Sequence, residues 1–327
     1  MDETALAAWL RQAAGTRSLE IVHLSRLSGG AIQQNWRVDA KVDGSTEAWV
    51  LRTDSSTTLS HSRSRTDEYR LLLAAHAAGV TVPEPLFLCT DPSVIGRPFF
   101  VMRRVEGVAA AHRVVRSERL GGGREALVAA LGRELARIHM IVPPRPDLPL
   151  QPPPADPAAR FIADMRAALD RGRLPRPMLE WGLRHLERNK PGPDDVVMIH
   201  NDFRTGNYMV ADAGITGILD WEFADWGDPH TDIGWMCAKS WRFGGPGEVG
   251  GVGSRAAFYS AYETESGRKI DPARVAWWEL AAAVRWAVIA IDQAERHLSG
   301  VEPSLELALT GHIVPVLERD IMRATAA

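Results

Sequence analysis

The chain has 327 residues, and 45% of them are hydrophobic, enough for a large buried core in about two domains, which excludes a disordered protein. Its 38 basic and 41 acidic side chains give a formal charge of −3, which argues against a general nucleic-acid-binding protein, because such proteins are usually basic over a whole domain. Two cysteines, Cys89 and Cys237, supply neither a disulfide framework nor a four-cysteine zinc site. The first residues lack the regions of a signal peptide, and no stretch reaches the roughly 18 apolar residues of a membrane span. We therefore expect a cytoplasmic protein that binds neither nucleic acid nor a membrane.

The charges are unevenly divided along the chain. Residues 1–190 carry a net charge of +6 and residues 191–327 a net charge of −9. This division suits a site that holds an anion on one side and cations on the other, and it is equally explained by surface charge that serves no site.

The first third of the chain alternates between strand and helix patterns. Apolar alternation and turn signals predict strands, and one apolar face ending at a glycine predicts a helix. The expected strands cover 21–27, 33–40, 47–53, 86–89 and 98–105, and the expected helix covers 60–79. A sheet with one main helix indicates a small α+β lobe.

The rest of the chain is mostly helical in pattern, after a proline-rich connector at 143–157 that excludes regular structure. A buried strand at 196–200 and a hairpin at 208–219 interrupt the helices. Helices are expected at 124–141, 158–170, 177–189, 231–241, 254–266, 272–298 and 303–323. Trp277 and Trp278 are adjacent in one of these helices, so we expect them to face different sides and not to share one core.

The segment 196–236 carries the clearest chemistry. An apolar strand leads to His200, Asn201 and Asp202, Asn207 follows five residues after Asp202, and the hairpin returns the chain to Asp220. Two carboxylates and an amide oxygen are ligands that suit Mg²⁺, and a carboxylate that is no ligand can orient a hydroxyl group or accept its proton. The alternative is ordinary turn chemistry, which explains a lone Asp-x₄-Asn. A zinc site at His200 lacks a second ligand at suitable spacing, so we expect His200 to support the loop through hydrogen bonds.

Together these motifs resemble a known family. The pattern His200-x-Asp202-x₄-Asn207, followed by Leu219-Asp220-Trp221, is similar to the catalytic loop and metal motif of the aminoglycoside phosphotransferase and choline kinase superfamily. The helix at 285–300 resembles, more diffusely, the branch associated with acyl-CoA dehydrogenases. The resemblance implies a bilobal protein-kinase-like α+β fold, with an N-lobe over 1–105 and a C-lobe over 106–327.

The resemblance also assigns roles in the C-lobe. Asp202 would be the catalytic base or hydroxyl-orienting carboxylate, and Asn207 and Asp220 would hold Mg²⁺ against the phosphates of ATP. The GDPHTDIG stretch places Asp232 where a carboxylate would brace the catalytic loop, although a helix N-terminal charge is an equal explanation.

In the N-lobe the resemblance implies a nucleotide site. The turn Ser28-Gly29-Gly30 would approach the phosphates through its backbone N–H groups. Arg52 stands where the family has a lysine that grips the phosphates, and Glu68 matches its acidic partner. The strand before residue 105 would place the backbone around Met102, Arg103 and Val105 against adenine.

The sequence therefore predicts an ATP- and Mg²⁺-dependent transfer of the γ-phosphoryl group to a hydroxyl of a small molecule. The acceptor stays open between an aminoglycoside-like compound, a hydroxyacyl compound and another metabolic alcohol. Arg52 keeps a second hypothesis, a nucleotide-binding pseudokinase that regulates a partner. The sequence carries no signal for an oligomeric state.

Overall fold

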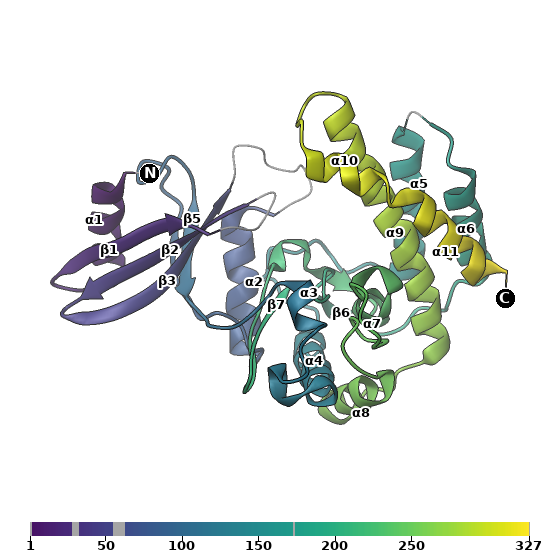
Figure 1. The fold of residues 1–327 in the computed structure, drawn as a ribbon, viewed down its shortest axis with the longest axis horizontal. Helices are drawn as coiled ribbons and strands as arrows, with labels where there is room; N and C mark the ends of the chain where they lie inside the picture. The colour runs from purple at the N-terminus through teal and green to yellow at the C-terminus, as the bar shows by residue number, and fades with distance from the viewer. Residues whose placement is uncertain (1, 28–32, 55–62, 173, 327) are drawn as a thin grey trace.

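The computed structural model describes residues 2–27, 33–54, 63–172 and 174–326. A sheet with two helices forms one end of the molecule, and helices form most of the other (Figure 1). This division is the bilobal arrangement that the sequence predicts. The N-terminus lies in the sheet end and the C-terminus in the helical end.

The N-terminal sheet is antiparallel, with the strand order β1-β2-β3-β5-β4. The long strands β2 and β3 meet at the turn that Asp43 and Gly44 form with positive φ, where the sequence predicts it. The strands are β1 (Leu19–Arg26), β2 (Gln33–Val42), β3 (Ser45–Asp54), β4 (Pro85–Cys89) and β5 (Phe99–Arg103).

Two helices accompany this sheet. The expected one is α2 (Arg65–Ala77). Ser64 caps its N-terminus, because the Ser64 hydroxyl accepts a hydrogen bond from the N–H of Asp67. The other, α1 (Glu3–Ala13), is not among the sequence-based expectations. Its fully buried Leu6 and Leu10 pack into the cluster on the face of the sheet that contains Trp49 and Phe99.

The helical end surrounds two short strand pairs. One pair is the hairpin of β7 (Tyr208–Ala211) and β8 (Gly214–Ile218), and the other joins β6 (Val197–Ile199) to β9 (Asp225–Gly227). The expected helices are present, with additional short ones. They are α3 (Ala111–Val114), η1 (Leu120–Gly122), α4 (Arg124–His139), α5 (Pro157–Arg171), α6 (Pro177–Arg188), η2 (Trp221–Phe223), α7 (His230–Cys237), η3 (Lys239–Trp241), α8 (Arg255–Ser266), α9 (Pro272–Leu298), α10 (Leu305–Gly311) and α11 (Val314–Thr325).

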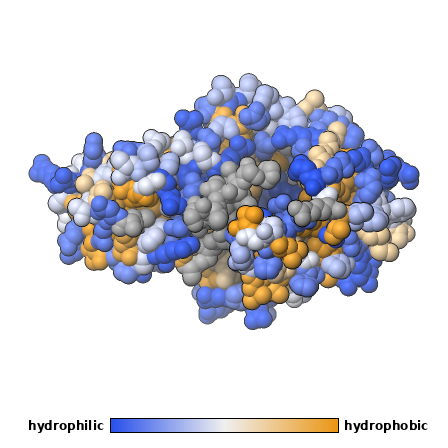
Figure 2. All heavy atoms as spheres, turned by 90° about the horizontal axis from the view of Figure 1, so that it is seen from above, coloured by the Kyte–Doolittle hydropathy of each residue, from blue (hydrophilic) through white to orange (hydrophobic). Residues whose placement is uncertain are grey.

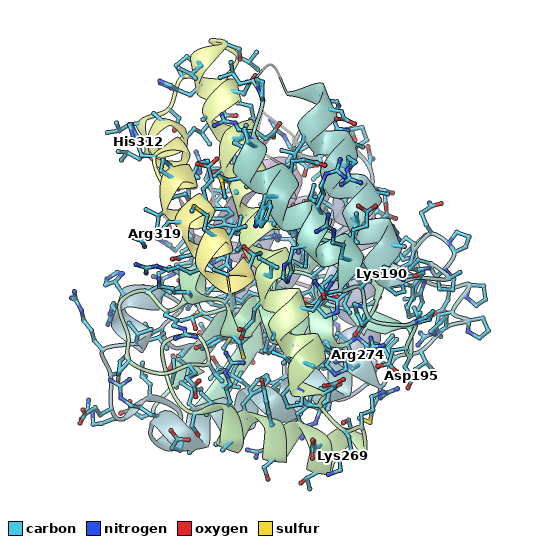
Figure 3. All side chains as sticks on the ribbon, turned by 90° about the vertical axis from the view of Figure 1, so that its right-hand side faces the viewer. Lys190, Asp195, Lys269, Arg274, His312 and Arg319 are labelled. Atoms are coloured by element: carbon cyan, nitrogen blue, oxygen red, sulfur yellow. The ribbon has the colours of Figure 1, made fainter. Side chains whose placement is uncertain are left out.

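Two expected helices are interrupted. The helix predicted over 231–241 ends at Cys237, because Ala238 adopts extended backbone angles before η3 begins. The helix predicted over 303–323 is two helices, α10 and α11, with Pro315 in the first turn of α11. Proline has no N–H to donate to the preceding turn and its ring clashes there, so it starts a helix and does not continue one. His312 lies at this junction and projects outward from the helical end (Figure 3).

The expectation for Trp277 and Trp278 is wrong. Both are buried in one cluster with α5, α6 and α11, and both rings meet the ring of Phe161 edge-on, at centroid distances of 6.2 and 5.6 Å. Neighbouring positions of α9 share this core because α5 and α6 cover a broad arc of the helix.

The largest core cluster joins α2, α4, α8 and the strands β6 to β8, so the hydrophobic core continues from the sheet end beneath the segment 197–227. Seen from above, hydrophilic residues cover most of the face in view and apolar residues form separate patches (Figure 2). Among the described residues, no helix is both long and apolar enough to cross a lipid bilayer.

Candidate active site

The loop after β6 is held in place by Asp232. The three residues of β6 are buried, and the chain then turns into the loop 200–207. Asp232, in the first turn of α7, accepts hydrogen bonds from the backbone N–H groups of His200 and Asn201, both at 2.7 Å. Its carboxylate is fully buried. The expectation that Asp232 braces this loop is confirmed. Asp232 also lies in the first turn of α7, so it is both a loop brace and a negative charge at a helix N-terminus.

Two further buried side chains hold Asp232. The Nε2 of His139 lies 3.2 Å from its Oδ2, and the Nδ1 of His139 lies 2.8 Å from the hydroxyl of Tyr262. A carboxylate only accepts, so Nε2 carries the hydrogen and Nδ1 accepts from Tyr262. Burial lowers the pKa of His139 and outweighs the opposing effect of Asp232, so the ring is neutral.

His200 connects the loop to the neighbouring hairpin. Its Nε2 donates to the carbonyl of Leu219 at 2.8 Å, and its Nδ1 accepts from the N–H of Asp202 at 3.3 Å. The expectation that His200 supports the loop through hydrogen bonds is confirmed. Asn201 has a φ of +63°, a strained value that is maintained by two hydrogen bonds, from its N–H to Asp232 and from its side-chain amide to the carbonyl of Phe223.

Three donors fix the carboxylate of Asp202. Its Oδ1 accepts from the indole of Trp235 at 2.8 Å and from the Nε of Arg204 at 3.1 Å, and its Oδ2 accepts from the amide of Asn207 at 2.5 Å. The side chain is still 14% exposed. Asp202 is therefore held in one orientation, and part of its side chain stays accessible.

Asn207 and Asp220 are brought to the same place by the β7–β8 hairpin. The N–H of Leu219 donates to the carbonyl of Asn207 at 2.8 Å, which ties the residue before Asp220 to the loop. Asp220 has a φ of +61° and its side chain is 38% exposed. The amide nitrogen of Asn207 is used by Asp202, so its oxygen is the atom that can bind a cation. Asp220 is partly exposed, whereas Asn207 is buried. A carboxylate and an amide oxygen are both hard donors, and this kind of donor set fits Mg²⁺.

Arg52 joins Asp220 to the N-terminal sheet. Its guanidinium contacts both oxygens of Glu68, through Nε at 3.1 Å and Nη2 at 3.0 Å, and Nη2 lies 3.0 Å from the Oδ1 of Asp220. The structure thus brings together Arg52, Glu68 and Asp220. Arg52 and Glu68 are buried, so their charges are held in a medium that screens them weakly.

A second arginine, Arg65 of α2, is also buried beside Glu68 of the same helix. It contacts Glu68, and its Nε lies 2.9 Å from Asp54, while Nη2 lies 3.8 Å from Glu222. Burial lowers the pKa of Arg65 and the positive charge of Arg52 adds to this effect, against the opposing carboxylates. Helix α2 is therefore fastened to the chain around Asp220 at two points.

The remaining nucleotide-site residues stay predictions. Ser28, Gly29 and Gly30 lie outside the described residues. Arg103 uses its side chain for Glu47 and Glu84 and its N–H for the carbonyl of Glu84. Met102 belongs to β5 and pairs with Val50 of β3. Val105 follows the strand, and within the described part of the chain its N–H donates to no backbone carbonyl.

A pocket of about 140 Å³ lies next to the loop, between α5, α7 and α9. Asn201 and Trp235, which belong to the loop and to its support, are in its wall. Arg285 completes the link, because its Nη1 donates to the carbonyl of Asn201 at 2.9 Å and to its side-chain oxygen at 2.7 Å. The other lining residues are Phe161, Asp164, Met165, Thr231, Trp278 and Ala282.

Two arginines near Asp202 lie over tryptophan rings. Arg285 lies 4.6 Å from the ring centroid of Trp235, and Arg204 lies 4.6 Å from that of Trp241. Such pairs hold a guanidinium flat against an aromatic face. Burial lowers the pKa of Arg285, while Asp202 and Asp232 oppose this effect.

A second group of titratable residues lies beyond the loop and consists of Asp194, Asp228 and His230. The side chain of Arg274 contacts both carboxylates of this group. Arg274 donates to Asp228 at 2.8 Å and lies 3.5 Å from Asp194, and the Nε2 of His230 accepts from the backbone N–H of Asp271. Figure 3 shows Arg274 on α9 in this part of the molecule. Burial raises the pKa of Asp228, but the bonds from His230 and Arg274 outweigh it, so the pKa is lowered. The group is an internal ion-pair cluster.

Sequence reasoning missed several residues of the site. Arg204 was within reach, because it lies inside the motif, two positions after Asp202. Trp235, His139, Tyr262 and Arg285 come from distant helices, and no local spacing links them to the loop.

The profile of the phosphotransferase enzyme family matches residues 23–278. Acyl-CoA dehydrogenase family member 10 of Mus musculus is 28% identical over 251 residues, which are 72% of this chain and 22% of that protein. The chain thus spans less than a quarter of the length of this relative. The expected similarity to proteins associated with acyl-CoA dehydrogenases is confirmed.

Solved structures show the same fold. A protein of Ralstonia eutropha JMP134 assigned as an aminoglycoside phosphotransferase superposes with a TM-score of 0.76 at 22% identity, covering 99% of this chain and 98% of that one. A thermostable mutant of the aminoglycoside phosphotransferase APH(4)-Ia, in complex with ADP and hygromycin B, gives a TM-score of 0.63 at 15% identity and covers 99% of both chains. The predicted kinase-like α+β fold is confirmed.

Proposed function

Since the chain belongs to the phosphotransferase enzyme family, we propose that it transfers the γ-phosphoryl group of ATP to a hydroxyl group of a small molecule, with Mg²⁺. The observation that carries this proposal is the carboxylate of Asp202, which three donors hold in one orientation at the end of a braced loop. A fixed and accessible carboxylate aligns a hydroxyl nucleophile and takes its proton. We expect this activity in the cytoplasm.

Phosphate charge would be handled by residues of both parts of the chain. Asp220 and the amide oxygen of Asn207 would hold Mg²⁺, which neutralises charge on the phosphates when it is bound. Arg52 carries a buried positive charge, held by Glu68, beside Asp220. Residues 1–105, with Ser28 to Gly30 and the backbone near Val105, would bind the nucleotide, and residues 106–327 would supply the catalytic loop and the acceptor site.

Two kinds of acceptor are compatible with the family. The complex with hygromycin B suggests an aminoglycoside-like acceptor, and the net charge of −9 over 191–327 suits a polycation. However, two of those acids, Asp228 and Asp232, are buried and paired with protein groups, so their charges do not face an acceptor. The aromatic and arginine side chains near Asp202 suit a hydroxyacyl compound or another metabolic alcohol better.

Arg52 supports a second candidate function, a nucleotide-binding pseudokinase. In the family pattern a lysine grips the phosphates, and here the arginine is already bound to two acids. Such a protein would bind nucleotide without turning it over. The ordered Asp202 argues for the enzyme, because a pseudokinase has no need of an oriented carboxylate.

The proposal is tested by calorimetric titration with ATP, with and without Mg²⁺, followed by ADP release with a panel of alcohols. We expect Mg²⁺-dependent binding, and Asp202→Ala should abolish transfer while ATP binding changes less than threefold. Asp220→Asn should weaken binding only when Mg²⁺ is present. Turnover by Asp202→Ala comparable to that of the natural chain would remove Asp202 from the mechanism, and an unchanged Mg²⁺ dependence in Asp220→Asn would remove the metal assignment. Tight binding that ignores Mg²⁺ would favour the pseudokinase.

A further inference from the structure

Among the described residues, the walls of the pocket beside the catalytic loop are largely apolar and aromatic and include one cation. The rings of Phe161, Trp235 and Trp278 and the side chains of Met165 and Ala282 line it, together with the polar residues Asn201 and Thr231. Arg285 is partly buried and contributes the positive charge. The carboxylate that the described part of the chain contributes to the wall, Asp164, is 61% exposed and lies 3.6 Å from Arg160 on the same helix.

Half of the guanidinium of Arg285 is available to a ligand. Nη1 uses its two hydrogens on the carbonyl and side-chain oxygens of Asn201. Within the described parts of the chain, neither Nε nor Nη2 of Arg285 donates to a protein acceptor. An arginine with one edge free presents two parallel N–H groups, which match the two oxygens of a carboxylate.

The electrostatics beside Asp202 point the same way. Arg204 and Arg285 both lie near this loop, each against a tryptophan ring. A polycationic acceptor would meet two guanidinium groups on its way to Asp202, and like charges in a partly desolvated site repel one another strongly. A carboxylate would instead compensate the charge that burial disfavours on Arg285.

From these observations we propose that the acceptor is a small hydroxy acid whose carboxylate binds the free edge of Arg285, with its carbon chain between the aromatic walls. This inference rests on the proposed function and names its substrate class. Arg285 also binds Asn201, the residue before Asp202, so a carboxylate there is separated from a hydroxyl at Asp202 by a short carbon chain. The hydroxyl oxygen forms a bond to the γ-phosphorus as the bond from that phosphorus to the bridging oxygen of ADP breaks, and the hydroxyl proton passes to Asp202.

The subsite is tested by binding, which needs no turnover. Butyrate, butyramide and butylammonium have similar size and differ in charge, and each is titrated into the full chain while tryptophan fluorescence is recorded. We expect butyrate to bind at least tenfold more tightly than the other two. Arg285→Gln should remove that preference and leave the affinity for butyramide within twofold. This comparison of two ligands in two proteins separates the charge contact from any movement of the loop.

Arg184→Gln provides the matched control, because Arg184 is 63% exposed on α6 and pairs with Glu180. It should keep the preference for butyrate. Equal or tighter binding of butylammonium, a preference for butyrate that survives Arg285→Gln, or no binding of butyrate at millimolar concentrations would each overturn the inference.

Failure of the subsite is distinguishable from failure of the proposed function. Asp202-dependent ADP release with aminoglycosides and not with short hydroxy acids would leave the phosphotransferase function standing and overturn the carboxylate site. Arginine-dependent binding of butyrate in a chain that binds no ATP would support the subsite and overturn the function.

Discussion

The replacement Asp232→Asn is a direct test of how the loop 200–207 is held. The natural carboxylate is fully buried and has two oxygens, of which one accepts from Asn201 and the other from His200 and His139. Asparagine retains one acceptor oxygen and puts an NH₂ group in place of the other. Whichever way the amide turns, at least one backbone N–H of the loop faces another donor.

The magnitude follows from these contacts. Losing a hydrogen bond to a charged group costs about 1.5–3 kcal/mol, and leaving a buried N–H without an acceptor costs about 1–3 kcal/mol. The two effects describe partly the same loss, so we expect Asp232→Asn to lower the free energy of unfolding by about 2–4 kcal/mol, which is less than their sum. That is a large share of the roughly 5–15 kcal/mol by which folded domains are stable.

Urea unfolding followed by tryptophan fluorescence measures this change, with Asp212→Asn as the control. Asp212 is exposed on the β7–β8 turn, and its replacement should change stability by no more than about 0.5 kcal/mol. If transfer activity is found, the replacement should lower kcat by a larger factor than it changes KM for ATP, because the loop carries Asp202, whereas the proposed nucleotide site lies within residues 1–105. Equal stability of the two variants would refute the view that Asp232 holds the loop.

Three further predictions concern the supports of the site. In Gly250→Ala the new Cβ would lie 2.2 Å from Thr205 Oγ1 at a φ of +55°, which should cost about 2–4 kcal/mol. Urea unfolding should show only about 1–2 kcal/mol for Gly300→Ala, where φ is +77° and no atom lies within 4 Å, and equal losses would exclude the contact with Thr205. Burial lowers the pKa of His139 in the folded chain, so as the pH falls below about 6.5 the unfolded chain takes up a proton on this residue before the folded chain does. Protonation of His139 therefore reduces the free energy of unfolding by up to about 1.4 kcal/mol per pH unit. His139→Gln should therefore flatten the decline of the unfolding free energy between pH 6.5 and 5.5, and an unchanged slope would show that the ring is not kept neutral. Arg52→Lys replaces a planar guanidinium, which contacts both Glu68 and Asp220, with a single ammonium group, and it should lower the free energy of unfolding by about 1.5–3 kcal/mol. A variant as stable as the natural chain in urea would mean that the contact with a second carboxylate contributes nothing to stability.

The sequence was sufficient for the parts of the site that depend on local spacing. Asp202 and Asn207 are five residues apart in one loop, and their side chains touch because the loop is short. The hairpin could be predicted from its alternation and turn, and it is the hairpin that returns the chain to Asp220. Each of these relations is fixed by backbone geometry over a few residues.

The missed parts depend on how helices pack. Arg285 reaches Asn201 across 84 positions of sequence, and Trp235 reaches Asp202 across 33. The helical spacing in the sequence predicts only that both residues lie on a helix with an apolar or amphipathic face. It does not predict which neighbouring element that face contacts. The error over Trp277 and Trp278 has the same origin, because the number of helices around α9 decides how much of its circumference is buried.

The position of Arg52 defines what separates the enzyme from the pseudokinase. The same nitrogen, Nη2, lies 3.0 Å from Glu68 and 3.0 Å from Asp220, so Arg52 neutralises an oxygen of Asp220 that would serve as a ligand for Mg²⁺. Glu68 is buried and stays paired, whereas Asp220 is 38% exposed and can exchange its partner. In an enzyme, phosphate would take the place of Asp220 at Arg52, and Asp220 would become free for the metal. Nucleotide binding should then require both Mg²⁺ and Arg52. Arg52 would compensate the charge of the phosphate, and Mg²⁺ would compensate the charge of Asp220 once Arg52 has released it. If Arg52 instead keeps Asp220 when nucleotide binds, the metal has lost its carboxylate, and binding without Mg²⁺ is the expected signature.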